Sequence, residues 1–490
     1  MKKIAFLLLV ISQGLYSQEY SSRLIDPETN DAVPYATVLV GQNQGIISND
    51  QGYFSFDWKQ IKNPLDSIEI SSMGYLTIKV PFESPLDSVI YLKESTYELA
   101  QVIIESNPLD VDEIMERLIE NLDKNHPDIY RESQVFYRQS QITSMKKMDF
   151  ELKESTLEGF DVSFIDSVQA LIPKHTAYYY EMAGTRIGNF KKGKLSISKA
   201  AELYDKEKDL SFDGIGEKME DIFTSNVKSN SYLKIKSGIF STKVQLDSIL
   251  DSNKEMEEAV EEVKEKEGFY QFSYFEGSIN RLFDDLFYRE DSELDIIEKE
   301  SRYRWELEGY ELIQNEAVYK INFTPKGGRD FQGVIYVNMD DFGVMRLDFH
   351  NVKNISSFNL LGLSYQENQY SGKVIFTRED GIYYPQFMEL IEGDSFGVKR
   401  PLKIIEKNKF VKGRRKQNEI YFKMNIKVDS QTKHELLILS SKASSETAYK
   451  ALERNKDFEA TYLSKFDPEF WEEYLIIEPN ETIQSFSIEQ

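Results

Sequence analysis

Residues 34–56, PYATVLVGQNQGIISNDQGYFSF, decide how the first part of this chain folds. Runs rich in β-branched and aromatic residues occupy both ends of the stretch, and glycine, asparagine and aspartate lie between them. Short runs of this kind, separated by turn-forming residues, predict strands joined by tight turns. Residues 49–52 then form a turn, and Phe54 and Phe56 share the strand face that points into the core.

Asp50 raises an alternative, because aspartate in a polar loop can also bind calcium. A calcium loop needs several oxygen ligands spaced along it and typically a closing bidentate acid. Asn49 and Gln51 flank Asp50, but the segment has no Asp-x-Asp pattern and no closing glutamate. We therefore interpret residues 49–52 as a turn between two strands.

The same pattern continues to about residue 106. Further strands are expected at Ser67–Ser71, Leu76–Pro81, Ser88–Leu92 and Leu99–Glu105. About seven strands at this spacing, without a long helix among them, predict a β-sandwich over residues 18–106.

The order of these segments resembles the carboxypeptidase-regulatory-like domain, a transthyretin-like sandwich common in cell-envelope proteins of Bacteroidetes-type bacteria. The resemblance is carried by the opening stretch, then SIEISSMGYLTIKV, SVIYL and ELAQVIIES. Asn49 departs from the pattern, because the family often has threonine before the aspartate. The resemblance implies an accessory module without peptidase activity. Later segments (FYRQSQ, FQGVIYVN and PEFWEEYLIIEP) resemble parts of envelope proteins that share this N-terminal domain.

The first residues predict export. Lys2 and Lys3 precede the apolar run Ile4–Ile11, and the small polar tail GLYSQ follows, which is the pattern of a signal peptide over residues 1–17. The alternative is a buried N-terminal strand. The run is shorter than the roughly 20 residues that span a bilayer, and no later segment is long enough for a transmembrane helix. We expect a periplasmic, outer-membrane-associated or cell-surface protein.

Composition excludes some classes of function. The net charge of −24 repels phosphate backbones, so nucleic-acid binding is not expected. The chain has no cysteine, which excludes disulfides and cysteine-ligated metals. At 490 residues it is long enough for two or three domains.

Residues 107–130 predict a connecting amphipathic helix. Asp110 suits the N-cap position, and Glu113 completes a capping box three residues later. The apolar residues repeat with helical spacing along one face: Val111, Ile114, Met115, Leu118, Ile119 and Leu122.

Residues 131–490 predict a β-rich domain with helical insertions and a C-terminal helix. Alternating strands recur, with turns at Gly327-Gly328 and at Asp340–Gly343. Helices are expected over residues 252–266 and after Asp467-Pro468, where aspartate caps and proline takes the first position. The fold class is therefore mainly β: a sandwich followed by an α+β region with a large antiparallel, curved sheet and a few helices. The pattern is compatible with an open or a closed sheet.

No catalytic template is complete. The histidines His126, His175, His350 and His434 are far apart in the sequence, and none belongs to an HExxH helix. The pairs Asp284-Asp285 and Asp340-Asp341 are ordinary among 83 acidic residues. We therefore nominate no catalytic, cofactor-binding or metal-binding residue, and we expect no cofactor.

Three hypotheses of function follow. The first is a non-enzymatic envelope protein whose sandwich serves as accessory or docking module for a β-rich domain that binds a surface partner. The second is a carrier of lipid or another hydrophobic ligand, since the strand order is similar to the curved sheets of lipoprotein-carrier-like periplasmic proteins. An ordinary sheet packed on helices is the alternative to such a cradle. The third is a carboxylate-dependent hydrolase, which requires clustered carboxylates with shifted pKa values in a cleft.

Overall fold

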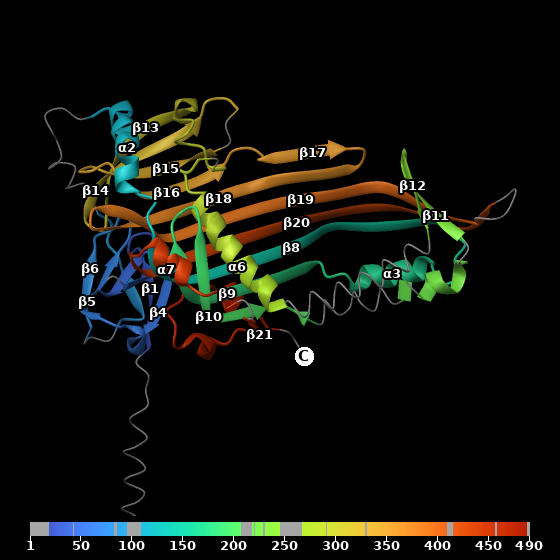
Figure 1. Cartoon of the computed structure of the whole chain (residues 1–490), viewed down its shortest axis with the longest axis horizontal. Coiled ribbons are helices and arrows are strands. Elements are labelled where there is room, and N and C mark those ends of the chain that lie inside the picture. The colour runs from blue at the N-terminus through green and yellow to red at the C-terminus, as the bar shows by residue number, and fades with distance from the viewer. Residues whose placement is uncertain are drawn as a thin grey trace, which may run out of the picture.

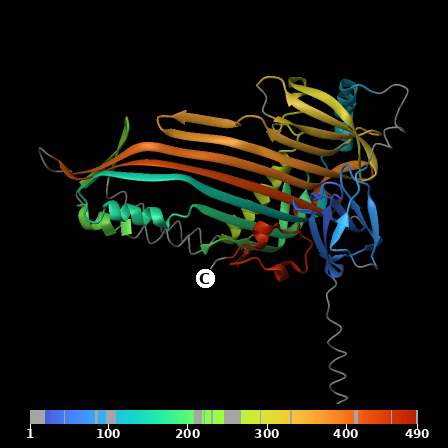
Figure 2. The ribbon, with the colours of Figure 1, turned by 180° about the vertical axis from the view of Figure 1, so that it is seen from behind.

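The computed structural model describes residues 19–487, apart from residues 43, 83–85, 96–108, 207–217, 220, 229–230, 246–266, 291, 329–330, 409–414 and 456–457. A small β-sandwich packs against one end of a long, open sheet (Figure 1 and Figure 2). The predicted leader, the strand predicted at Leu99–Glu105 and the helix predicted at residues 252–266 lie outside the described residues.

The N-terminal part is the seven-stranded sandwich that the sequence predicted. One sheet has the order β4-β1-β7 and the other the order β3-β2-β5-β6. Phe54 and Phe56 are buried between the sheets, which confirms the predicted core face. The strands are β1 (Glu19–Ile25), β2 (Thr37–Gly41), β3 (Gln44–Ile47), β4 (Tyr53–Asp57), β5 (Pro64–Ser71), β6 (Ile78–Pro81) and β7 (Val89–Tyr91), and the short 3-10 helix η1 (Trp58–Gln60) follows β4.

The second part is one 14-stranded sheet, whose main path runs β13-β14-β15-β16-β18-β19-β20-β8-β9-β10-β21. Beside this path, β17 pairs with β18, and β11 pairs with both β12 and β19. The sheet is antiparallel except at the pair of β10 with β21. The predicted large antiparallel sheet is confirmed, and it is open.

The strands of this sheet differ greatly in length. The longest, β8, β19 and β20, have 25, 27 and 28 residues and run side by side through the whole molecule (Figure 1). The strands are β8 (Arg131–Ser155), β9 (His175–Gly188), β10 (Gly193–Leu203), β11 (Ser231–Ser237), β12 (Phe240–Gln245), β13 (Tyr303–Ile313), β14 (Glu316–Pro325), β15 (Phe331–Asn338), β16 (Val344–Asn351), β17 (Ser356–Leu360), β18 (Leu363–Glu379), β19 (Ile382–Asn408), β20 (Lys416–Ala443) and β21 (Thr461–Leu463).

The two faces of this sheet pack against different elements. On β20, Leu436 and Ile438 join the apolar core beneath helices α2 (Val111–Asn125) and α6 (Glu267–Asp284). Leu437 points the opposite way and packs with residues of the sandwich and of the C-terminal segment. We call these the helix face and the sandwich face. Successive residues alternate between them, as the pleat of a strand requires.

The helix predicted after Asp110 is confirmed as α2. Asp110 accepts a hydrogen bond from the Glu113 backbone, and the Glu113 side chain returns one to the Asp110 backbone, which completes the capping box. Ile114, Met115 and Leu118 of its apolar stripe are buried in the core, Val111 and Leu122 pack against that core, and Ile119 is 39% exposed. At the far end of the molecule, α3 (Val162–Leu171) covers a separate apolar cluster on the same face.

The C-terminal segment, residues 461–487, packs against the sandwich and against the sandwich face of the sheet. The start signals at Asp467-Pro468 begin the 3-10 helix η3 (Pro468–Trp471) instead of a longer α-helix, and Trp471 is buried. The remaining helical elements are short: η2 (Glu300–Arg302), α7 (Glu446–Ala451) and α8 (Glu481–Gln484).

Candidate functional site

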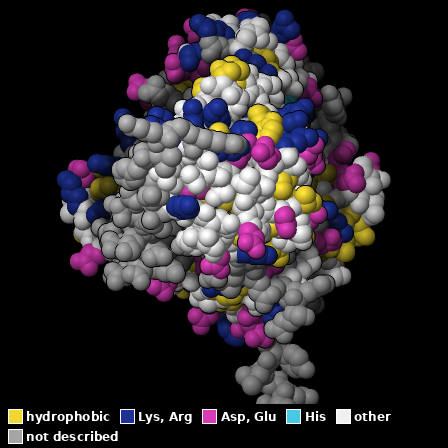
Figure 3. Space-filling model, turned by 90° about the vertical axis from the view of Figure 1, so that its right-hand side faces the viewer, with side chains coloured by type: hydrophobic (Ala, Val, Ile, Leu, Met, Phe, Trp, Pro, Cys, Tyr) yellow, Lys and Arg dark blue, Asp and Glu magenta, His cyan; other side chains and the backbone are white. Residues whose placement is uncertain are grey.

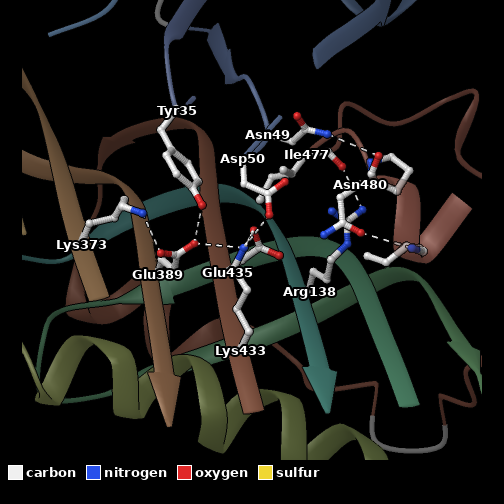
Figure 4. Close-up of polar contacts among 12 residues, drawn as sticks. Tyr35, Asn49, Asp50, Arg138, Lys373, Glu389, Lys433, Glu435, Ile477 and Asn480 are labelled. Atoms are coloured by element: carbon white, nitrogen blue, oxygen red, sulfur yellow. Dashed lines mark hydrogen bonds and ion pairs between the residues drawn. The ribbon is translucent and has the colours of Figure 1, made fainter. Parts of the chain in front are cut away.

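The sandwich is fixed to the long sheet through a chain of alternating charges (Figure 4). Glu389 on β19 accepts from Lys373 Nζ at 2.7 Å and lies 3.0 Å from Lys433 Nζ. Lys433 also lies 2.9 Å from Glu435. From the sandwich, the Tyr35 hydroxyl donates to Glu389 at 2.8 Å. These side chains are all on the sandwich face, so the network joins the two parts of the protein.

The charges in this network stabilise each other. Burial alone would raise the pKa of Glu389, but the ammonium groups of Lys373 and Lys433 outweigh burial and lower it. Burial would likewise lower the pKa of Lys433, but the carboxylates of Glu435 and Glu389 raise it. Each group is therefore held in its charged form because its partners are present.

Asp50 contributes to the same junction. Residues 49–52 form the predicted turn, closed by a hydrogen bond from Gly52 N to Asn49 O at 3.1 Å. Asn49 Oδ1 accepts from the backbone of Gln51 and Tyr53, and its amide donates to Pro479 O at 3.4 Å. Asp50 lies 3.8 Å from Lys433 Nζ. The turn thus places its carboxylate against a lysine of the long sheet.

A second polar contact holds the C-terminal segment. Arg138 on β8 and Glu181 on β9 are both buried and lie 2.6 Å apart. Arg138 also donates to Ile477 O at 2.9 Å, and Trp471 Nε1 donates to Glu181 at 2.8 Å. The buried ion pair therefore holds the C-terminal segment at two points, Trp471 and Ile477.

The helix face carries its own polar cluster, where α6 meets the long strands. Tyr137 and His434 Nδ1 are 2.7 Å apart, and His434 Nε2 lies 3.4 Å from Glu392. Arg281 on α6 binds Glu392 at 2.5 Å and lies 3.4 Å from Asp285.

Two carboxylates of this cluster have oppositely shifted pKa values. Burial would raise the pKa of Glu392, but hydrogen bonds from His434 and Arg281 outweigh burial and hold it at about 2. Burial raises the pKa of Asp285 in spite of the nearby Arg281 charge. Opposite shifts occur in acid–base pairs, but here Arg281 lies between the two carboxylates, within ion-pair distance of both. The arrangement is that of an ion network that holds α6 to β19.

The four histidines lie in four different environments. His126 is buried against aromatic rings and accepts from the Val344 backbone at 3.1 Å, and burial lowers its pKa to about 3. His175 contacts Ser144, His350 contacts Gln332, and His434 belongs to the α6 cluster. Within the residues that the structure describes, no group of three or more histidine or acidic side chains is arranged to hold a metal ion.

Between the core under α6 and the cluster under α3, the helix face is apolar, and the residues that the structure describes cover it only in part. The strand register places five side chains in one row across five strands: Phe358, Tyr365, Phe396, Val428 and Met145. The neighbouring row holds Leu360, Leu363, Val398, Ile426 and Met148. Every one of these side chains is partly buried or exposed, and Phe396 is 45% exposed. We call the two rows the apolar rows.

The opposite face of the same strands is polar. On β20, Lys423, Asn425, Lys427 and Asp429 alternate with the apolar side chains of the helix face. Antiparallel sheets commonly have one solvated face and one packed face. Here the face with the apolar pattern is only partly packed, so it can accept an apolar ligand or partner.

Comparison with known families identifies the first part of the chain. Residues 21–104 match the family model of the CarboxypepD_reg-like domain. The N-terminal sandwich is a CarboxypepD_reg-like domain. This confirms the family that the opening stretch resembles. No curated protein sequence matches the chain.

Similar solved structures include the LolA superfamily protein NE2245 from Nitrosomonas europaea, at 9% identity over 70% of this chain and 98% of that one, with a TM-score of 0.15. MucB in complex with MucA(peri) is 6% identical over 65% of this chain and 94% of its own, with a TM-score of 0.16. The MucA/MucB complex of Pseudomonas aeruginosa is 6% identical over 64% and 93%, with a TM-score of 0.17.

Two cavities lie beside the C-terminal segment, and only the smaller one is lined by residues of the CarboxypepD_reg-like domain. The larger, about 490 Å³, is bounded by β8, β9 and the end of the chain, with Ile142, Ala177, Tyr179 and Phe486 among its lining residues. The smaller, about 260 Å³, lies between η3 and the CarboxypepD_reg-like domain. Neither cavity includes the carboxylates of the α6 cluster. Among the described helices, none has the length and apolar character needed to cross a membrane.

Sequence reasoning missed the junction of the CarboxypepD_reg-like domain with the sheet and the apolar rows. Tyr35 lies in the turn before β2, Arg138 in β8 and Lys433 in β20, and only the tertiary fold brings them together. The apolar rows had a readable signal, because residues 422–428, FKMNIKV, alternate strictly between apolar and polar side chains. That alternation indicates a face, but it does not show whether the face is covered.

Proposed function

We propose that this protein is a non-catalytic binding protein of the cell envelope that holds a hydrophobic ligand on the apolar rows of its long sheet. The CarboxypepD_reg-like domain serves as a fixed accessory module that braces one end of that sheet. The leader pattern over residues 1–17 and the CarboxypepD_reg-like domain, which is typical of exported proteins, support the envelope location.

The observation that carries the proposal is the incomplete covering of the helix face. Antiparallel sheets usually bury their apolar face, yet ten adjacent side chains in the apolar rows remain partly or fully accessible. Contiguous exposed apolar surface marks binding sites more often than chance. Covered clusters at both ends of the rows bound the accessible stretch.

The role of the CarboxypepD_reg-like domain rests on the junction network. Its contacts through Tyr35 and Asp50 use charges on the sheet's own strands. The domain therefore docks on its own chain, and the strands that leave the junction continue as β19 and β20 into the apolar rows.

The hydrolase hypothesis is less well supported. Arg281 is ion-paired with both of the carboxylates that have shifted pKa values, Glu392 and Asp285, which argues against their acting as an acid–base pair.

Binding of a fluorescent fatty acid to the chain from Gln18 onward tests the proposal. We expect saturable binding that Phe396→Ser weakens about tenfold, because burying a phenylalanine side chain stabilises a complex by about 1.5–3 kcal/mol. Leu76→Ser, at an exposed leucine of the CarboxypepD_reg-like domain, is the matched control and should leave binding unchanged. The proposal fails if the unchanged protein does not bind the probe, or if Phe396→Ser binds it as tightly.

A further inference from the structure

The hairpin between β17 and β18 ends in an apolar tip. Leu360 is 65% exposed, and Leu361 next to it is also exposed. Leu361 has φ +52° and Gly362 has φ +81°, as in a two-residue turn of the primed type. Such turns favour asparagine, aspartate or glycine, and a leucine in the left-handed region is strained. The equivalent turn between β18 and β19 has the usual pair, Asp380-Gly381.

A second hairpin, between β11 and β12, repeats this feature. Its two turn residues are Gly238, with φ +60°, and Ile239, which is 80% exposed. Phe240, the next residue, is exposed as well. Exposed isoleucine and phenylalanine at a turn contribute nothing to a core, so folding does not explain them.

The two tips meet at one edge of β19. The hairpin of β17 and β18 pairs with β19 as far as Val398, and β11 pairs with the same edge from Lys403 onward. Between them, the Lys399 backbone donates to Gly362 O at 2.7 Å. Arg400 donates to Ser237 O at 2.8 Å and lies over the Phe240 ring. We call Leu360, Leu361, Ile239 and Phe240 the tip residues.

The three segments that carry or adjoin the tip residues are basic, although Lys403 among them is ion-paired with Glu419 of β20. The chain carries a net charge of −24, yet residues 231–245, 355–366 and 395–405 contain no aspartate or glutamate. These three segments contribute only basic charges: Lys234, Lys236, Lys243, Lys399, Arg400 and Lys403. Figure 3 looks onto this end of the molecule, where apolar side chains lie among lysine and arginine side chains and also among aspartate and glutamate side chains.

We propose that the tip residues and the basic side chains around them form a docking edge for an anionic lipid bilayer. Exposed leucine, isoleucine and phenylalanine insert into the boundary between headgroups and acyl chains, where their burial is favourable. The surrounding ammonium and guanidinium groups attract anionic headgroups. Charge complementarity thus selects the occupant, since the rest of this acidic protein repels such a surface. The inference does not depend on ligand binding at the apolar rows.

Vesicle flotation tests the proposal. All variants are made in the chain from Gln18 onward, which keeps every described residue and removes an apolar leader that would itself bind lipid. The protein should float with vesicles of phosphatidylethanolamine and phosphatidylglycerol at low salt. It should float much less with vesicles of phosphatidylcholine alone, and less with anionic vesicles at high salt because salt screens the attraction.

Paired substitutions locate the contact. Leu360→Ser with Leu361→Ser, and Ile239→Ser with Phe240→Ser, should each weaken partitioning about tenfold. Leu76→Ser with Tyr91→Ser removes two exposed apolar side chains from the CarboxypepD_reg-like domain and should have no effect. Circular dichroism and melting temperatures establish that each variant is folded.

Three results would overturn the proposal. The unchanged protein could fail to float with anionic vesicles, or it could float equally with both kinds of vesicle at every salt concentration. The tip variants could float as well as the control pair. The unchanged protein could also form a dimer that the tip substitutions convert to a monomer without changing flotation. The tip residues would then contact a second copy of the chain and not a membrane. Leu360 belongs to the apolar rows as well as to the tips, so the Ile239→Ser, Phe240→Ser variant separates this test from that of the proposed function: it should lose flotation and keep fatty-acid binding.

Discussion

At the scale of single residues, His126 makes the stability of the protein depend on pH. Its ring is buried among aromatic side chains, and burial lowers its pKa from 6.5 to about 3. Below pH 6.5 the unfolded chain binds a proton at this position that the folded protein does not bind. The folded state is therefore progressively disfavoured as the pH falls from 6.5 towards 3.

Replacing His126 by asparagine should flatten the pH dependence of unfolding. One titrating group changes the free energy of unfolding by at most about 1.4 kcal/mol per pH unit, which sets the size of the effect. The measurement is the free energy of unfolding by urea between pH 7.5 and 4.5. The quantity to compare is the slope of the free energy of unfolding against pH, because the substitution also removes packing and lowers stability at every pH.

His350→Asn is the matched control, since His350 is exposed beside Gln332. It should keep the slope of the unchanged protein. Equal slopes for the unchanged protein and for His126→Asn would contradict the assignment of this pH dependence to His126.

At the scale of elements, the turn of β17 and β18 is strained in a way that one substitution relieves. Leu361 occupies the left-handed region, which asparagine adopts more easily than leucine by about 1 kcal/mol. Leu361→Asn should therefore raise the melting temperature slightly or leave it unchanged. The same variant should float less with anionic vesicles, because an apolar tip residue is lost.

Asp380→Asn is the control for this prediction, because it changes a turn that already has a favourable residue in the same region. It should alter neither stability nor flotation. A clear loss of stability in Leu361→Asn would show that Leu361 serves the fold, and the functional interpretation of its strain would be wrong.

Elements with a local physical cause were predictable from the sequence. The capping box at Asp110 and Glu113 and the apolar stripe behind it define α2, and the turn at residues 49–52 follows from its own side chains. The 3-10 helix η3 shows the limit of local signals. A correct cap and proline begin a helix, but they do not determine how far it continues, because Trp471 is buried in the core three residues after the proline.

At the scale of the whole molecule, Lys433 should control how firmly the CarboxypepD_reg-like domain is held. Lys433→Met leaves Glu435 and part of Glu389 without their counter-charge in a mostly buried site. Removing one partner of a buried ion pair costs about 3–5 kcal/mol, and we expect the lower end because Lys373 still contacts Glu389. Hydrogen exchange of residues 35–47 should become faster, while exchange in β13 to β16 should not change.

Lys427→Met, at an exposed lysine on the same face of β20, is the matched control and should leave hydrogen exchange unchanged. Unchanged exchange at residues 35–47 in Lys433→Met would show that apolar contacts alone hold the junction.

The sequence predicted the sandwich, its family and the large antiparallel sheet, but it did not predict their junction. Alternation of side chains within a strand is visible in the sequence and shows that the strand has an apolar face. The hydrogen bond between Tyr35 and Glu389 is not visible in this way, because it joins positions 354 residues apart. The α6 cluster and the meeting of the two tips at Arg400 are likewise products of tertiary structure. Candidate sites of this kind arise from strand order and register, which one sequence does not specify.

The length of β19 separates the junction from the tips. Glu389, at the junction, and Arg400, between the tips, are eleven positions apart on one strand, which corresponds to about 36 Å. A bilayer at the tips would therefore hold the CarboxypepD_reg-like domain at a fixed stand-off from the lipid. Removing two residues from every long strand between these points would shorten that reach by about 7 Å and keep each side chain on its face. Removing one residue from each long strand would instead turn its apolar side chains to the opposite face of the sheet and its charged side chains to the helix face.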